Sequence, residues 1–392
     1  MLVAACTFDR SPFESPPVVA SEPASQPEVG DRPSSAMDER SATSASASAE
    51  PDPAWALEWR ELASAAQREG RLSLLTWVGR GYRRTIEAFQ RAFPGVQVEH
   101  VEESSADVWL ERVRRERRVG TYAFDLGFLH TDRALKDGAP EGMWAPLKPL
   151  LFHPDVLNEA AWRDGLAERF VDAAGELCFG WSYSVFHCYA INTDLVAEGE
   201  ITSVRDLLDP RWRGRILTGD PRLGTGLLSA ASVARAWGSS ILKPLLVDQR
   251  PVIVNGGPAS VAEPLARGRY PIALGVRPKA LDPLRERGIG FRVRYLDLPD
   301  ADFVPTGSLL YFDRAPHPAA ARLFANWVLT REGQAILAGS LQTNSARTDL
   351  GPFQIDETGR PNGAYYEPDR ETNLAHTAAT EALVRALLAG RG

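Results

Sequence analysis

Short clusters of glycine with polar side chains follow several apolar segments of this chain. Two of them combine glycine with a group suited to an anion, Gly79-Arg80-Gly81 and Gly224-Thr225-Gly226. Arg80 carries a planar fork that can bind a carboxylate or phosphate through two hydrogen bonds. Glycine before a helix lets backbone N–H groups approach an anion closely, and the Thr225 hydroxyl can add one more bond. We therefore expect both clusters to contact a ligand.

Further candidate contacts also follow apolar segments, and each of them could instead have a purely structural role. Ser104, Ser105, His130 and Thr131 follow the next two apolar segments, while Asn255, Gly256 and Arg277 follow later ones. Ser105 or Thr225 could simply cap a helix, and the glycines could form ordinary turns. Other candidate contacts lie where the chain is expected to cross between two halves: Trp181, Ser182, Tyr183, Thr306 and Ser308.

The sequence favours binding over catalysis. Its six histidines are scattered without an HExxH pattern, and no Gly-x-Ser-x-Gly elbow occurs. The one acid–base pairing that can be suggested is Asp132 with His130. Cys178 and Cys188 flank a segment that could turn back as a hairpin, so a disulfide stays open beside two buried free thiols. We expect no catalytic residue, no cofactor and no resident metal.

The elements that position these residues form two successive α/β patterns. In the first, strands at 72–78, 96–101 and 124–129 alternate with helices at 59–69, 83–93 and 106–119. A β-α-β-α-β order predicts a parallel sheet with right-handed crossovers. The candidate clusters follow the strands, at the carboxyl ends where open α/β sheets bind ligands.

The second pattern begins after a long aromatic and β-branched segment, 179–191. We expect a short helix at 204–208, followed by strands at 215–218, 252–255 and 271–276 with helices at 225–237 and 260–266. Strands at 291–298 and 308–312, and helices at 319–330, 333–338 and 378–388, complete the chain. The sequence therefore predicts an α/β fold.

Composition excludes several classes of protein. The 392 residues carry a net charge of −7, of which residues 1–50 account for −5, so the body is nearly neutral. An acidic chain of this kind is not expected to bind nucleic acid. No run approaches the roughly 20 apolar residues of a transmembrane helix.

The first fifty residues are expected to lie outside the fold. Residues 7–50 are rich in Ser, Pro, Ala and Glu and have little apolar surface to bury, which predicts a flexible tether. The preceding Leu2-Val3-Ala4-Ala5-Cys6 resembles the end of a bacterial lipoprotein signal, with Cys6 as the lipidated residue. The basic and apolar regions of such a signal are missing, so the true start lies upstream or the resemblance is accidental. The hypothesis is a membrane-anchored lipoprotein in the periplasm or on the cell surface.

Five sequence blocks carry a family resemblance, in order, between about residues 60 and 350. They are 69–70 with 88–98, 190–194, 206–215, 268–273 and 327–334, of which Asp206-Leu207-Leu208-Asp209-Pro210-Arg211-Trp212-Arg213-Gly214-Arg215 is the most specific. Together they resemble bacterial extracellular solute-binding proteins of the ferric-iron, thiamine and polyamine type, the receptors of ABC importers.

This resemblance implies a type II periplasmic-binding-protein fold. Its two α/β lobes are joined by two crossing hinge strands and close on a ligand in the cleft between them. By analogy, lobe 1 takes residues 51–190 plus 305–392, and lobe 2 takes residues 191–304. The implied partners are a small-molecule solute and an ABC permease, and we expect a monomer.

The iron-binding branch of the family differs from this chain at the metal site. Its adjacent tyrosines follow the block matching 271–273, where this chain has Val276-Arg277-Pro278, and Tyr365-Tyr366 lies elsewhere. Fe(III) needs several anionic oxygens, and Arg277 supplies a cation instead. Two arginines and several hydroxyls favour an anionic solute such as a phosphorylated sugar, a phosphonate or a carboxylate. A ligand-sensing domain of a receptor, or an enzyme on the same scaffold, remains the alternative.

Overall fold

The computed structural model describes residues 53–77, 80–360 and 363–389. The predictions for Cys6, for the tether at 1–50 and for Gly79 fall outside these ranges, as does the side chain of Arg80. Within the described ranges, no helix combines the length and the apolar character needed to cross a membrane.

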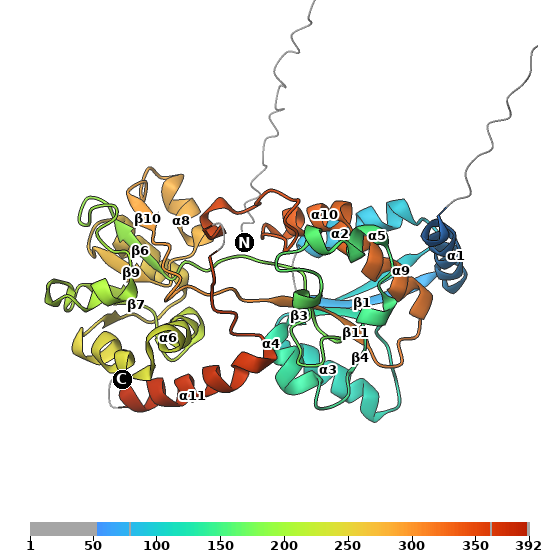
Figure 1. Ribbon diagram of the computed structural model, residues 1–392, viewed down its shortest axis with the longest axis horizontal. Coiled ribbons are helices and arrows are strands. Elements are labelled where there is room, and N and C mark those ends of the chain that lie inside the picture. Colours follow the sequence, from blue (N-terminus) through green and yellow to red (C-terminus); the bar gives the residue numbers. More distant parts are fainter. Residues whose placement is uncertain (1–52, 78–79, 361–362, 390–392) are drawn as a thin grey trace, which may run out of the picture. The chain divides into compact units, whose positions relative to one another are not determined.

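The first sheet has six strands, in the order β2-β1-β3-β11-β4 with β5 beside β11. Strands β1, β3, β4 and β11 are labelled in Figure 1. Strands β1 (Arg71–Trp77), β2 (Gln97–Glu103) and β3 (Leu126–His130) are parallel, which confirms the predicted β-α-β-α-β unit. Strand β11 (Gly307–Phe312) runs antiparallel to β3 and pairs with the two-residue strands β4 (Trp144–Ala145) and β5 (Phe179–Gly180). A strand from late in the chain therefore completes the first lobe.

Helices cover this sheet where the sequence predicted them. They are α1 (Ala54–Glu69), α2 (Arg80–Ala92), α3 (Ala106–Arg118), α9 (Pro318–Leu329) and α10 (Arg331–Leu341). Helix α1 ends at Gly70, whose φ of 71° is a left-handed conformation that glycine adopts readily. Phe89 and Phe324 are fully buried and meet edge to face, with ring centroids 4.9 Å apart, which joins α2 to α9 in the core.

The second sheet has five strands in the order β10-β6-β9-β7-β8. Strands β7 (Ile216–Thr218), β8 (Val252–Ile253) and β9 (Ile272–Leu274) are parallel, whereas β6 (Tyr189–Asn192) runs antiparallel to β9 and to β10 (Val293–Tyr295). Each parallel strand is followed by a helix: α6 (Gly224–Trp237), α7 (Pro258–Ala266) or α8 (Pro278–Arg285). Helix α8 was not predicted because Pro278 and Pro283 fall within its eight residues.

Short helical turns make up much of the remaining structure. They are α4 (Thr131–Arg133), α5 (Pro154–Leu157), η1 (Ala134–Gly138), η2 (Lys148–Leu150), η3 (Glu159–Ala161), η4 (Ala167–Arg169), η5 (Val204–Leu208), η6 (Pro210–Trp212), η7 (Ser239–Ile241), η8 (Pro244–Asp248) and η9 (Ile355–Glu357). The predicted helix at 204–208 is therefore a 3-10 turn, begun by a capping box on Ser203.

The segment 179–191 crosses from one sheet to the other. Its two ends form β5 in the first sheet and β6 in the second, and between them Phe186 pairs with Phe303 of the returning segment. Because its ends separate, no hairpin brings Cys178 and Cys188 together. Both thiols are free and buried, so the disulfide alternative is wrong. Burial raises the pKa of each thiol well above its ordinary value.

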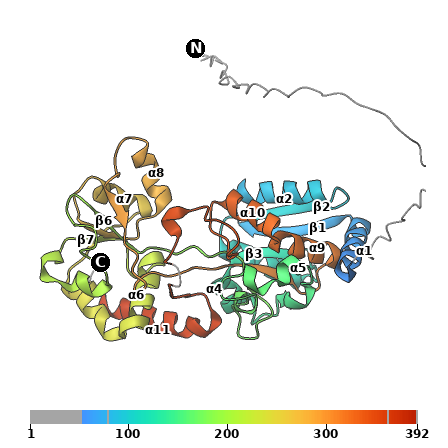
Figure 2. The ribbon, with the colours of Figure 1, turned by 45° about the horizontal axis from the view of Figure 1, so that its top comes forward.

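A third connection between the lobes is made by the C-terminal helix α11 (Glu371–Leu387), drawn in red in Figures 1 and 2. At its start, the N–H of Glu371 donates to the carbonyl of Val171 in the first lobe, at 3.0 Å. At its other end, Val384 and Leu388 are buried in the apolar core of the second lobe. The sequence placed this helix in lobe 1, whereas it contacts both lobes. The remaining lobe boundaries stay a prediction.

Candidate functional site

A cavity of about 330 Å³ lies at the carboxyl ends of the parallel strands in the second sheet. We call it the glycine pocket, because its lining includes Gly219, Gly226, Gly256, Gly257 and Gly275. Thr225 and Asn255 also line it, so four residues predicted from sequence come together here: Thr225, Gly226, Asn255 and Gly256. Backbone groups are accessible in such a wall because glycine has no side chain to cover them.

The start of helix α6 forms one side of the glycine pocket. Its N-cap is Leu223, which offers no side-chain hydrogen bond, so the alternative that Thr225 caps the helix is wrong. Among the described residues, no backbone carbonyl accepts a hydrogen bond from the N–H groups of Gly224, Thr225 or Gly226. A Cβ on Gly226 would lie 2.8 Å from Cα of Pro221, so glycine is required for this close approach. Unpaired N–H groups at a helix start suit an anion.

Asp220 is the one charged side chain among the described residues of this lining, and it forms an ion pair with Arg222. Its carboxylate is 2.8 Å from the guanidinium of Arg222, and this hydrogen bond holds the pKa of Asp220 below its ordinary value. Arg222, which lies outside the described lining, offsets the charge of this carboxylate, and the helix N–H groups then favour an anion.

A second cavity, of about 470 Å³, lies at the carboxyl ends of β1 and β3 in the first sheet. We call it the aromatic pocket. Its walls carry the rings of Trp77, Tyr82, Phe128, His130, Trp181 and Phe186, and Lys279 from the start of α8 in the second lobe. Four residues predicted from sequence line it: His130, Trp181, Ser182 and Thr306.

Among the described residues, the lining of the aromatic pocket carries one cation and no anion. Burial lowers the pKa of His130 and raises that of Tyr82, so both groups are uncharged near pH 7. Lys279 has no ion-pair partner among the described residues, and none of the described lining residues is acidic. The described lining therefore combines aromatic rings with the positive charge of Lys279.

Arg277 does not occupy the predicted position as a free cation. Its guanidinium donates to a carboxylate oxygen of Glu357 at 2.6 Å and lies 3.2 Å above the ring centroid of Phe186. Lys279, two residues further along, supplies the unpaired charge instead. Sequence reasoning missed Lys279 because α8 was not predicted, and it missed Trp77, Tyr82 and Phe186 because aromatic residues at strand ends are equally typical of a core.

Several other predicted contacts have structural partners. The hydroxyl of Thr131 is 2.7 Å from that of Ser308 in the buried interior, and Ser105 accepts a hydrogen bond from Val108 N–H as the cap of α3. Arg163 lies 4.2 Å above the ring of Tyr183. Ser104 is exposed on the surface outside both pockets, and Gly81 packs against the carbonyl of Ser340 in α10. Neither pocket includes these six predicted residues in its described lining.

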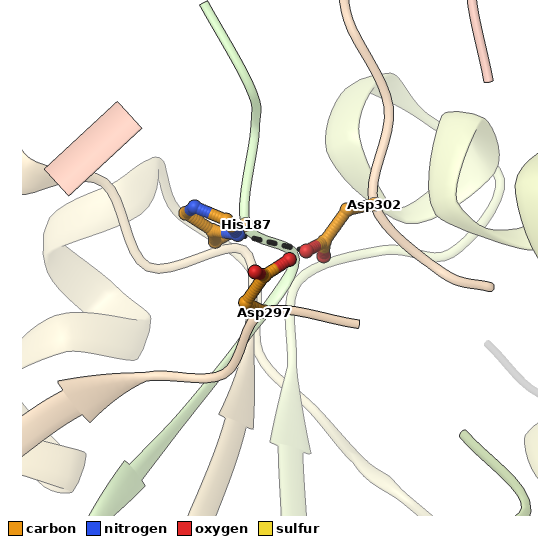
Figure 3. A group of neighbouring side chains, drawn as sticks. All are labelled: His187, Asp297 and Asp302. Atoms are coloured by element: carbon orange, nitrogen blue, oxygen red, sulfur yellow. Dashed lines mark hydrogen bonds and ion pairs between the residues drawn. The ribbon is translucent and has the colours of Figure 1, made fainter. Parts of the chain in front are cut away.

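His187, Asp297 and Asp302 gather where the crossing segments meet (Figure 3). The ring of His187 lies 2.8 Å from Asp302 through Nδ1 and 3.2 Å from the carbonyl of Thr358 through Nε2. Asp302 also accepts the backbone N–H groups of Cys188 and Leu298, at 2.8 and 2.9 Å. These bonds engage both ring nitrogens of His187 and both carboxylate oxygens of Asp302, so the cluster fastens the crossing segments together.

The adjacent tyrosines at 365 and 366 are also engaged. The hydroxyl of Tyr365 donates to Asp297 at 2.7 Å, and that of Tyr366 lies 2.9 Å from the hydroxyl of Thr377. Burial raises the pKa of both phenols, which disfavours the phenolate form that Fe(III) requires.

Residues 81–340 match the family model described as bacterial extracellular solute-binding protein. The chain belongs to this family. Comparison with curated protein sequences finds no match. The five blocks of resemblance in the sequence are thereby supported by a match that covers both lobes.

Solved structures confirm the type II periplasmic-binding fold of this solute-binding protein. A ferric binding protein of Bordetella is 17% identical, with a TM-score of 0.63 over 81% of this chain and 98% of its own. An ABC transporter protein from Clostridium perfringens is 16% identical, with a TM-score of 0.63 over 81% and 99%. AfuA from Actinobacillus pleuropneumoniae, solved with fructose 6-phosphate, is 18% identical, with a TM-score of 0.51 over 79% and 97%.

Proposed function

We propose that this solute-binding protein captures a small anionic solute between its lobes and delivers it to the permease of an ABC importer. The observation that carries the proposal is the start of α6, where the N–H groups of Gly224, Thr225 and Gly226 have no backbone acceptor among the described residues. Aligned helix N–H groups favour a carboxylate or phosphate at this position. They lie at the carboxyl ends of parallel strands, where α/β sheets bind ligands.

The charges around the two pockets support an anion over a cation. Asp220 is paired with Arg222, and Lys279 remains without an ion-pair partner among the described residues. A polyamine or a hard metal ion would need several carboxylates, and the described lining of the aromatic pocket provides none. Proteins of this fold bind varied cargo, since one structural relative is named a ferric binding protein and another was solved with fructose 6-phosphate.

Delivery to an importer gives the location that we propose. The protein acts outside the cytoplasm, in the periplasm or at the cell surface, as a monomer. A lipid on Cys6 would hold it at the membrane, with residues 7–50 as the spacer. A flexible spacer of this length reaches roughly 35 to 40 Å on average, which would let the anchored protein meet a permease.

Calorimetry on the full chain tests the anionic cargo. The probes are citrate, inorganic phosphate, fructose 6-phosphate and spermidine. Gly226→Ala should weaken the binding of any anion, because the new methyl group collides with Pro221 and displaces the helix start. Gly351→Ala is the control, since a Cβ there meets nothing within 4 Å and Gly351 lines neither pocket. Binding of spermidine alone would contradict the proposal, as would an anion that Gly226→Ala binds like the parent.

A further inference from the structure

We infer that the solute carries a planar ring, which the aromatic pocket holds and the indole N–H of Trp181 selects. The solute class is an aromatic or heteroaromatic ring that bears a carboxylate or phosphate. This inference rests on the proposed function and specifies its cargo. It is carried by three features of the aromatic pocket: the ring faces, one unpaired donor and the isolated charge of Lys279.

The aromatic side chains present a continuous set of faces and edges. Tyr82 and Phe128 have ring centroids 5.2 Å apart, and Phe128 meets Trp181 edge to face at 6.1 Å. On the same wall, Trp77 and His130 are perpendicular, with centroids 4.4 Å apart. Tyr82, Phe128 and Trp181 are buried, so the more exposed rings of Trp77, His130 and Phe186 are the ones that can contact a further planar ring, which gains specific geometry as well as apolar contact.

Trp181 supplies the donor that lacks a partner. Its side chain is only 5% exposed, and among the described residues nothing accepts a hydrogen bond from its Nε1. The neighbouring serine hydroxyls, in contrast, have hydrogen-bond partners. The hydroxyl of Ser184 lies 3.0 Å from that of Thr343, and the hydroxyl of Ser182 accepts the N–H of Gly307 at 3.5 Å. A buried polar group is costly when it is unpaired, so the indole N–H of Trp181 fits an acceptor atom on the ligand.

The charge of the pocket decides which kind of ring enters it. Aromatic walls also suit a quaternary ammonium group, through cation–π attraction. Here Lys279 lines the cavity without an ion-pair partner among the described residues, and no acidic side chain of the described lining offsets it. A cationic ligand would be repelled by Lys279 and would have no atom to accept the N–H of Trp181. A ring that carries a hydrogen-bond acceptor and a negative group would pair with both the N–H of Trp181 and the charge of Lys279.

One small molecule can reach both pockets. Gly275 lines the glycine pocket and Lys279 lines the aromatic pocket, only four residues further along the chain. Four residues span at most about 14 Å even when fully extended. A ring in the aromatic pocket therefore leaves its carboxylate or phosphate close to Lys279 and directed toward the glycine pocket.

The test measures affinities of the full chain for four ring anions: nicotinate, 4-hydroxybenzoate, pyridoxal 5′-phosphate and adenosine 5′-monophosphate. At least one should bind with a micromolar Kd, and more tightly than fructose 6-phosphate. Trp181→Phe keeps the apolar ring and removes only the N–H, so it should weaken that ring anion about tenfold and leave fructose 6-phosphate unchanged. Lys279→Met should also weaken it about tenfold, with a smaller loss at high salt.

Matched variants control for general damage. Trp212→Phe removes an equally unpaired indole N–H from the core of the second lobe, and Lys243→Met removes an exposed cation paired with Asp248. Both should bind the ring anion like the parent. The inference is overturned if none of the four ring anions binds, or if Trp181→Phe and Trp212→Phe have equal affinity. Binding of fructose 6-phosphate without any ring anion would overturn the ring while the anionic cargo stands.

Discussion

Replacing His187 with phenylalanine should destabilise the protein most strongly below about pH 6.5. His187 is almost fully buried, and its protonated ring donates to Asp302 at 2.8 Å and to the carbonyl of Thr358 at 3.2 Å. Phenylalanine fills a similar volume but leaves both acceptors without this partner. One bond involves a charged group and the other a neutral carbonyl, so the expected loss is about 2 to 4 kcal/mol.

The pH dependence follows from the protonation of His187. Burial alone would lower the pKa of His187, but the hydrogen bond and the charge of Asp302 outweigh it and raise the pKa, with further contributions from Thr358 and Asp297. A histidine whose folded pKa is raised stabilises the fold fully below its unfolded pKa of about 6.5. That contribution is lost as pH rises through the folded pKa, so the parent should weaken toward alkaline pH and His187→Phe should weaken less.

Urea unfolding at pH 6 and pH 9 measures both effects. His153→Phe is the control, because burial lowers the pKa of His153 and its contribution is lost on acidification instead. The gap between the parent and His187→Phe should be wide at pH 6 and narrow at pH 9. A gap that is equal at the two pH values, or absent at both, would refute the role assigned to the His187–Asp302 bond at the crossing segments.

Three further predictions concern other buried or paired groups. Burial raises the pKa of Asp369 to about 7, so the folded state binds an extra proton between about pH 4 and pH 7. The free energy of unfolding should therefore fall as the pH rises through this range. Asp369→Asn keeps an acceptor for Thr306 N–H and should remove that fall in urea titrations. Glu357→Gln frees the charge of Arg277 and should tighten the binding of an anion several-fold in calorimetry, whereas unchanged affinity would place Arg277 outside the site. Leu388→Asp buries a charge where α11 meets the second lobe and should lower the unfolding free energy by about 2 to 4 kcal/mol. A much smaller decrease in unfolding free energy would show that α11 detaches freely from the second lobe.

Local patterns predicted most of the elements, because their signals are short-range. Gly70 ends α1 and Ser105 caps α3 through conformations and bonds that involve only a few neighbouring residues. Alternating strands and helices then predicted where parallel strands end, and this brought Thr225, Gly226, Asn255 and Gly256 into one pocket.

Partners that are distant in sequence were beyond such reasoning. Arg277 was predicted to end a strand with a free charge, whereas β9 ends at Leu274 and Arg277 precedes α8 with its charge paired to Glu357, 80 residues later. Cys178 and Cys188 are close in sequence, yet the chain between them passes from one sheet to the other. No local pattern indicates either outcome, because both depend on how the two lobes are connected.

Equilibrium dialysis against a small-molecule extract, followed by mass spectrometry of the retained compounds, tests the central claim most directly. The full-length parent should retain an anionic compound with a ring, in a one-to-one complex. Gly226→Ala should retain less of it, while Gly351→Ala, outside both pockets, should match the parent. Retention of a polyamine or a metal ion, or equal retention of the compound by Gly226→Ala and Gly351→Ala, would contradict the capture of an anionic solute at the start of α6.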